Sequence, residues 1–270
     1  EYGGATGGVV NVITKSGGNA PSGTVDVRFR NNDLVENGDF FDKSTQKSEA
    51  TQIGATFGGP IVRDRIWYFL AAQNDVTEVT PDESPTTQKF DGSYYLGKLT
   101  AQLGSNWQLA GKYSADPAEV NNANASQTVL EEANLFQEQG GDIVQADLTG
   151  TLSSNLLWNL RGGINRQELN AFPQGGNFDL AGHTDVNGVE PDSVNYTNAQ
   201  YSKRDRDQLL TDLSWFVNGG GAHEIKAGVG YEKLDFTSEN FTVSGYRYED
   251  DGALPFILWF EPNPGAAESS

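Results

Sequence analysis

Residues 1–17 read EYGGATGGVVNVITKSG. Two glycine pairs, Gly3-Gly4 and Gly7-Gly8, enclose a short turn, and the apolar run 9–13 follows, interrupted only by Asn11. Glycine permits positive φ angles and close approach of backbone segments. A strand that is apolar on both faces belongs inside a packed sheet. The opening stretch therefore predicts a tight turn that leads into a buried strand.

The rest of the chain alternates between apolar and polar residues, beginning at Thr24. The apolar positions are Val25, Val27 and Phe29; Ile53, Ala55 and Phe57; Tyr95, Leu99, Ala101 and Leu103; Trp107, Leu109 and Tyr113; Val144, Ala146, Leu148 and Leu152; Leu156, Trp158, Leu160 and Ile164; Leu209, Leu213, Trp215 and Val217; and Ile225, Ala227, Val229 and Tyr231. The opposite positions carry mixed charges, namely Arg28, Arg30, Lys98, Lys112, Asp147, Arg161, Asp212, Glu224 and Lys226. This alternation predicts an antiparallel sheet with one apolar face and one wet face. Segment 66–72 is apolar on both faces, so its orientation stays open.

Short and long connections alternate between these predicted strands. Short turns are expected at 105–106, 153–155 and 218–221. The long polar stretches are 31–49, 76–90, 116–140 and 169–203, with a short helix expected at 129–139 and no assignment for 237–270. Outer-membrane barrels have short periplasmic turns and long extracellular loops. The pattern therefore favours an all-β, antiparallel transmembrane β-barrel with nine or ten strands in this chain, with the charged positions facing a wet lumen.

Four tryptophans lie close to short turns: Trp67, Trp107, Trp158 and Trp215. Indole combines an apolar body with one N–H donor, and aromatic side chains of this kind form girdles at the two membrane interfaces. The four tryptophans therefore predict a periplasmic aromatic girdle. The alternative is that they are core aromatics of a soluble β-sandwich.

The opening stretch and two later strings, NGDFFD at 37–42 and FGGPIVRDR at 57–65, resemble TonB-dependent outer-membrane receptors of the Oar-like branch. The resemblance implies that residues 1–19 are the C-terminal end of a plug domain. Its motif residues are Glu1, Tyr2, Gly3, Gly4, Gly7, Gly8 and Asn11. Residues 20–270 would then form the N-terminal portion of the barrel, which has about 22 strands in plugged transporters.

The same resemblance implies active uptake of a scarce or bulky nutrient across the bacterial outer membrane. Its partners would be the outer-membrane lipid, the remainder of the receptor chain, the TonB complex acting through plug residues outside this chain, and an extracellular substrate that the sequence does not identify. A passive porin or structural surface barrel is the first alternative. A soluble β-sandwich adhesin or carbohydrate-binding module is the second.

Composition narrows the function classes further. The 270 residues contain 18 Lys and Arg against 37 Asp and Glu, a net charge of −19 that argues against nucleic-acid binding. There is no cysteine, which excludes a disulfide framework and a thiolate metal site within this sequence. There is no methionine either, so we expect the sequence to be a piece of something longer. No catalytic constellation converges, and we expect no enzyme activity.

Some acidic loop residues are oxygen donors of the kind that Ca²⁺ prefers. They are Glu131-Glu132, Glu249-Asp250-Asp251, and Asp39 with Asp42. His183 with Asp179 and Asp185 is a further candidate for a metal site. Solvated loop charge is the simpler explanation of both groups and the one we favour. We therefore expect no cofactor, with calcium at these loops as the alternative.

Overall fold

The structure is a computed structural model that describes residues 14–32, 47–252 and 254–260. The proposed plug motif at 1–11 and the NGDFFD string at 37–42 lie outside these residues. The described part contains no α-helix, and its short 3-10 turns include Glu131–Ala133 and Val243–Gly245. No helix among these residues is long and apolar enough to cross a membrane.

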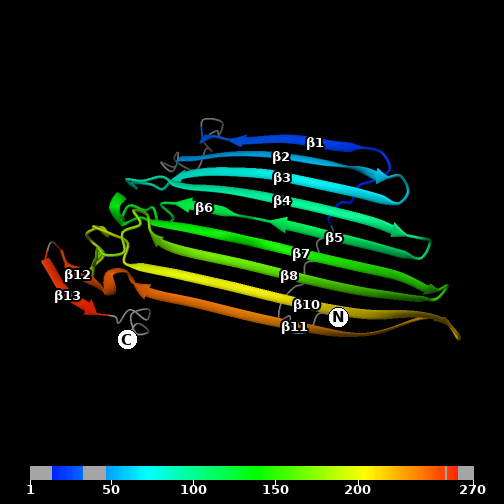
Figure 1. The fold of residues 1–270 in the computed structure, drawn as a ribbon. Coiled ribbons are helices and arrows are strands. Elements are labelled where there is room, and N and C mark those ends of the chain that lie inside the picture. Colours follow the sequence, from blue (N-terminus) through cyan, green and yellow to red (C-terminus); the bar gives the residue numbers. More distant parts are fainter. Residues whose placement is uncertain (1–13, 33–46, 253, 261–270) are drawn as a thin grey trace.

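One large antiparallel sheet dominates the molecule (Figure 1). Its strand order is β1-β2-β3-β4-β5-β7-β8-β10-β11, with β6 between β4 and β7, and a small sheet has the order β13-β12-β9. The strand bounds are β1 Ser22–Arg30, β2 Lys47–Val62, β3 Ile66–Thr80, β4 Gln88–Leu103, β5 Trp107–Ala115, β6 Ala118–Asn121, β7 Leu135–Ser153, β8 Leu156–Pro173, β9 His183–Asp185, β10 Asn198–Asn218, β11 Ala222–Thr242, β12 Tyr246–Asp251 and β13 Leu254–Phe260.

Strands β5 and β6 occupy one position in the large sheet, because both pair with β4 on one side and β7 on the other. The sheet therefore has nine strand positions, each next to its neighbour in the chain. This up-and-down antiparallel order confirms the predicted fold class. The described residues do not form a closed barrel, since β1 and β11 are not paired with each other.

Short and long connections separate to opposite ends of the sheet (Figure 1). The turns 63–65, 104–106, 154–155 and 219–221 lie at one end. The long connections 122–134 and 174–197 lie at the other end, together with β9, β12 and β13. The alternation of short and long connections that the sequence predicted is thus confirmed.

The predicted boundaries of the long connections are wrong. Strand β3 continues to Thr80 and β4 begins at Gln88, so only 81–87 connect them instead of 76–90. The expected helix at 129–139 is also wrong, because the segment contains only the turn Glu131–Ala133 and β7 begins at Leu135. A strand needs about 9–11 residues to cross a membrane. Strands of 15 to 21 residues therefore extend beyond the membrane. In the part outside the membrane both faces contact water, so the alternation of apolar and polar residues no longer marks the strand.

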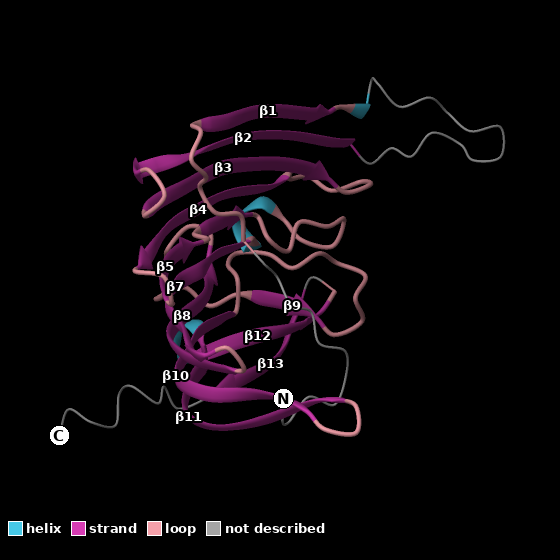
Figure 2. Cartoon of the chain, turned by 90° about the vertical axis from the view of Figure 1, so that its right-hand side faces the viewer, coloured by secondary structure: helices cyan, strands magenta, loops and turns pink. Residues whose placement is uncertain are grey.

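The large sheet is curved like a trough (Figure 2). Directly paired residues in an antiparallel sheet share a face. The register therefore places Val25, Ile53, Leu99, Leu148 and Leu160 on the same face, with the other predicted apolar positions from β1 to β11. Within segment 66–72, it places Tyr68 and Leu70 on this apolar face and Trp67 and Phe69 on the other.

The apolar side chains of the first face lie open to the surroundings. Val25 is 76% exposed and Val229 is 71% exposed, at opposite edges of the sheet. A β-sandwich would cover such a face with a second sheet, but within the described residues the only other sheet is the small β13-β12-β9 sheet at one end. The face is suited to contact with lipid.

Candidate functional site

The nine predicted lumen residues share one face of the sheet, opposite the apolar face. The register aligns Lys98 with Lys112, Asp147 with Arg161, and Lys226 with Ser214 beside Asp212. Arg28 pairs with Gln52, which pairs in turn with Asp75, so β1 joins the same face. Side chains two residues apart in a strand point to the same face. Arg30 therefore lies on the same face as Arg28, and Glu224 on the same face as Lys226.

Charges on this face neutralise one another across the strands. Arg161 lies 3.7 Å from Asp147 on β7 and 3.9 Å from Asp212 on β10. Asn159 donates a hydrogen bond of 2.8 Å to the other oxygen of Asp212. A network of this kind is stable in contact with water and polar protein surface, whereas lipid would penalise it.

The segment that leads into β1 lies against this polar face. We call residues 14–21 the strap. The Lys98 ammonium donates to the carbonyl oxygen of Thr14 at 3.3 Å, and the Trp67 indole N–H donates to Asn19 Oδ1 at 2.7 Å. Figure 2 shows the strap running down the concave side of the trough from β1. The polar face is therefore the concave, inner face, and the apolar face is the outer one.

A break in the wall divides β5 from β6. Pro117 has no N–H to donate, and across from it Gly140 has a φ of 131°. A Cβ at Gly140 would overlap the Asp116 carbonyl oxygen, so only glycine fits. At this break the Gly141 N–H donates to the Asp116 side chain, at 2.9 Å, and not to a backbone carbonyl of the neighbouring strand. This irregularity makes room for a pocket on the inner face.

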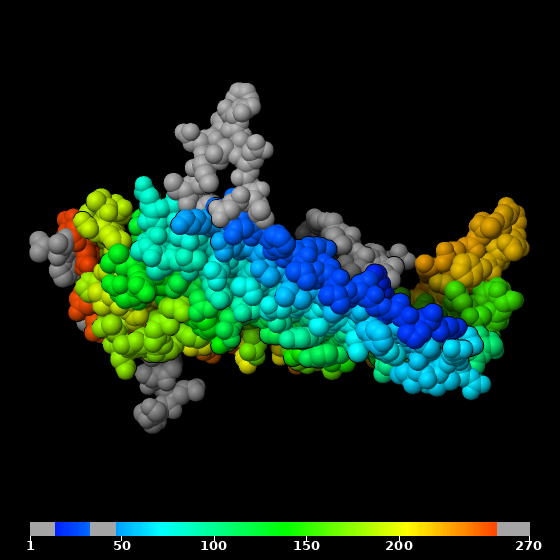
Figure 3. Space-filling model, turned by 90° about the horizontal axis from the view of Figure 1, so that it is seen from above, coloured from blue at the N-terminus to red at the C-terminus, as the bar shows by residue number. Residues whose placement is uncertain are grey.

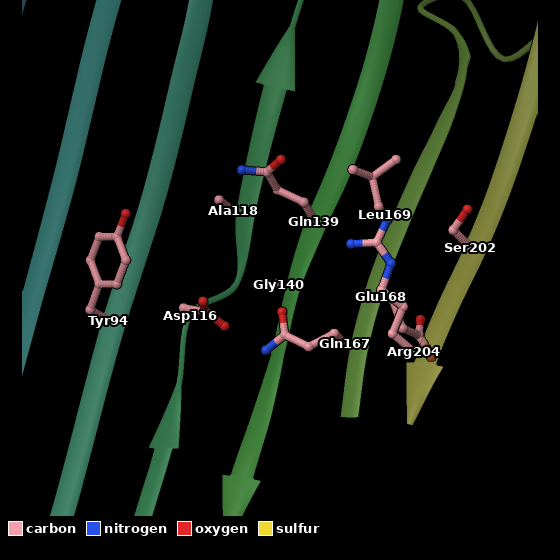
Figure 4. Close-up of a pocket in the computed structure, with 10 residues that line it drawn as sticks. All are labelled: Tyr94, Asp116, Ala118, Gln139, Gly140, Gln167, Glu168, Leu169, Ser202 and Arg204. Atoms are coloured by element: carbon pink, nitrogen blue, oxygen red, sulfur yellow. The ribbon is translucent and has the colours of Figure 1, made fainter. Parts of the chain in front are cut away.

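The pocket has a volume of about 260 Å³ and draws its walls from five strand positions (Figure 4). Tyr94 comes from β4, Gln139 from β7, Gln167 from β8, and Ser202 and Arg204 from β10, all on the inner face. Sequence reasoning missed most of this pocket, because it assigned 116–140 and 169–203 to loops. The Asp-Pro pair at 116–117 opposite the glycine pair at 140–141 is the signal that marks it.

Three polar groups of the pocket are available to a solute. Within the described part of the chain, the Tyr94 hydroxyl and the Gln167 amide have no hydrogen-bond partner, and Arg204 has no carboxylate at ion-pair distance. The Arg204 guanidinium instead lies 5.6 Å from the ring centre of Phe236. A hydroxyl, an amide and a guanidinium facing one pocket can bind a polar solute by hydrogen bonds.

Three of the four tryptophans point outward at the end with the short turns. Trp107, Trp158 and Trp215 share the outer face, and Trp107 and Trp158 meet edge to face at 5.7 Å between ring centres. The Trp158 N–H donates to the Thr211 hydroxyl at 2.8 Å. Trp67 differs, because its register with Pro60 and Thr100 puts it on the inner face, where Asn19 accepts its N–H.

The outer face changes from apolar to charged further along the strands. After Ile164 on β8 come Arg166 and Glu168, with Asp207 beside them on β10. Arg166 lies 2.6 Å from Asp207, and Lys203 lies 2.9 Å from Glu168. The outward apolar band is thus bounded by tryptophans on one side and ion pairs on the other.

The described residues contain no group of three or more His, Asp or Glu side chains that could hold a metal ion. His183 lies 2.8 Å from Asp250 and stacks on Tyr248 at 4.4 Å, so its ring is used within the small sheet. Asp185 accepts backbone N–H groups from Val189 and Glu190. Asp39 and Asp42, two of the calcium candidates, lie outside the described residues.

Comparison with known proteins gives two matches. The family model described as "Outer membrane beta barrel domain" matches residues 13–80 and 74–252. The TonB-dependent transporter Oar of Myxococcus xanthus is 36% identical over 76 residues, which is 26% of this chain and 7% of that protein. No solved structure matches the chain. The chain thus spans less than a tenth of the length of this relative.

Proposed function

This chain belongs to the outer membrane beta barrel domain family, and from that premise we propose that it is part of a TonB-dependent receptor of the outer membrane. Residues 1–19 would be the end of its plug and residues 20–270 the N-terminal portion of its wall. Nine strand positions are somewhat less than half of a barrel of about 22 strands. The receptor would take up a scarce or bulky nutrient. The match to a TonB-dependent transporter supports this proposal.

One observation carries the proposal. The strap lies on the polar inner face, where Lys98 binds Thr14 and Trp67 binds Asn19. The strap therefore approaches β1 from the concave side and not from a neighbouring position in the wall. A plug inside the barrel would place its last residues there.

The polar inner face fits the same proposal. The opposed pair Lys98 and Lys112 is unfavourable within the wall itself, because like charges directly across two strands repel. An oxygen from outside the wall, the Thr14 carbonyl, relieves the repulsion at Lys98. Further along the inner face, Tyr94, Gln167 and Arg204 would contact the solute. TonB would act through plug residues that this chain does not contain.

Cysteine labelling of the full receptor tests whether the N-terminus lies inside the barrel. A lipid-soluble thiol reagent should label Val27→Cys, on the outer face of β1, and leave Val10→Cys unlabelled. Labelling of both would place the N-terminus in the wall and favour a passive porin. Planar-bilayer conductance gives an independent result: a plugged receptor should show no steady current, whereas a porin conducts.

Orientation is tested separately with epitope insertions. We propose that the tryptophan end is periplasmic and the long connections are extracellular, as in other outer-membrane barrels. An epitope inserted at Gly188, in the connection 174–197, should be detected on intact cells. An epitope in the turn 154–155 should be detected only after the outer membrane is opened. The reverse pattern would overturn the assignment.

A further inference from the structure

The strap contacts the wall through its backbone at Gly17. A Cβ on Gly17 would overlap the Tyr68 carbonyl oxygen and lie 2.9 Å from the Gly59 carbonyl oxygen. The ideal Cβ position of Gly58 is 3.5 Å from the Gly17 Cα. Both segments can approach this closely because the glycines have no side chains at the contact. The Gly58-Gly59 pair of β2 is therefore a contact surface for the strap.

Asn19 makes three hydrogen bonds to the first short turn and the start of β3. Its Oδ1 accepts the Asp64 backbone N–H at 2.9 Å and the Trp67 indole N–H at 2.7 Å. Its Nδ2 donates to the Asp64 carboxylate at 2.5 Å. Asp64 itself has a φ of 62°, which the turn requires. One side chain thus connects the strap to the middle of the turn and to Trp67 at the start of β3.

The beginning of the strap is held by a third strand. The Lys98 ammonium on β4 donates to the Thr14 carbonyl oxygen at 3.3 Å and lies 3.4 Å from the Thr14 hydroxyl. Contacts with β2, β3 and β4 and with the turn 63–65 therefore fall on a segment of eight residues. Isolated surface hydrogen bonds are weak individually, but hydrogen bonds to β3, β4 and the turn and the close contact with β2 all have to be lost for the whole strap to move.

We propose that the strap is a fixed anchor, with Asn19 and Trp67 as the positioning residues that hold it, so that displacement of the chain during transport ends at Thr14. This inference rests on the proposed function, because it supposes a plug before Thr14. It adds that the plug cannot leave the barrel as a unit together with residues 14–21. Only the chain on the N-terminal side of Thr14 would move.

Pulling the full receptor in a supported bilayer from an N-terminal tag tests this. In the wild type, the length released before the wall yields should correspond to the chain up to Thr14. In Asn19→Ala, the anchor should yield at lower force and residues 14–21 should add about 26–29 Å, at 3.3–3.6 Å per residue. Trp67→Phe, which removes one donor, should also lower the final force.

Two controls make the test specific. Asn106→Ala lies in another short turn, where its side chain accepts from Ser105, and should leave length and force unchanged. Pro21→Cys with Gly59→Cys brings two Cβ positions to 3.5 Å, within the range of a disulfide. In the oxidised state, an Asn19→Ala receptor should still release residues 14–20 and then stop at the cross-link at residue 21, which marks the end of the strap on the length scale.

The outcomes separate the two proposals. A wild-type release that already runs to Ser22, or an Asn19→Ala receptor with unchanged length and force, overturns the fixed anchor and leaves the plug in place. Absence of any stepwise release before the wall unfolds overturns the plug itself, and with it the proposed function. A release that ends at Thr14 and lengthens in Asn19→Ala supports both.

Discussion

At the scale of single residues, Gly150 on β7 gives room to the outward tryptophans. It lies between Trp107 on β5 and Trp158 on β8 in the sheet register. A Cβ at Gly150 would overlap the ring of Trp107, whose atoms lie within 2.8 Å of that position. The edge contact with Trp158 limits how far Trp107 can rotate away. The absence of a side chain at Gly150 therefore allows the Trp107 ring to pack over β7 at this edge of the apolar band.

We expect Gly150→Ala to destabilise the receptor by about 1–3 kcal/mol, the usual cost of overpacking. Gly162→Ala is a matched control on the same outer face, where a Cβ meets only Leu209 at an ordinary 3.7 Å. It should change the free energy of unfolding by less than about 0.5 kcal/mol. Denaturant unfolding of the full receptor in liposomes measures both. Equal effects would mean that Trp107 moves freely.

At the scale of elements, sequence alternation correctly assigned the faces of the strands but not their ends. Leu148 and Leu160, which the sequence placed together, are directly paired on the outer face. The ends were missed because β8, with β7 beside it, continues past Ile164 into a region where polar residues occupy both faces, such as Arg166 outside and Gln167 inside. The orientation of Trp67 was also beyond the sequence, because segment 66–72 is apolar on both faces and only the register with Pro60 and Thr100 assigns Trp67 to the inner face.

Adjacent residues of β8 should respond oppositely to the same charge. Leu160→Arg places a cation on the outer face opposite Leu148, and we expect a loss of about 2–4 kcal/mol near the membrane midplane. Asn159→Arg places it on the inner face, within reach of Asp212, and should be tolerated. Unfolding of both variants in lipid bilayers measures the difference. Equal destabilisation would argue that both faces are dry.

The connection that follows β9 should lose protection against amide hydrogen exchange in acid. Hydrogen bonds from the backbone N–H groups of Glu190 and Val189 hold the pKa of Asp185 below its ordinary value. A lowered pKa stabilises the folded form above the unfolded pKa, about 3.9, and this stabilisation is lost as pH falls through the folded pKa.

Amide exchange protection at 189–190 should therefore be constant from neutral pH to about pH 5 and fall in more acidic solution. Asp185→Asn cannot titrate, so its protection should be lower at neutral pH and flat with pH. The same acid profile in both proteins would show that another group controls this connection.

At the scale of the whole molecule, the two edges of the large sheet decide what the chain can do alone. Strand β1 is the first strand of the sheet, and Figure 3, seen from above, shows it uncovered along the length of the molecule, with every one of its residues exposed. Strand β11, with 21 residues, forms the opposite edge, and its residues 222–240 are exposed. Each of these two strands has one hydrogen-bonding edge with which no other described strand pairs. Sequence alternation predicts strands, but it does not show what lies beyond such edges.

An unpaired peptide group in lipid costs several kcal/mol, so an open sheet with two free edges is not stable within a bilayer. We therefore expect residues 1–270, produced alone, to give no folded monomer in liposomes, whereas the full receptor should fold there. Resistance to protease and a heat-dependent shift in gel mobility report folding, and sedimentation in detergent reports the number of chains. A protease-resistant monomer of 1–270 would contradict the argument, because both edges would then have to be satisfied without another strand. Since each edge offers a whole row of N–H and C=O groups, the strands that pair with β1 and β11 are as necessary to this wall as its own side chains.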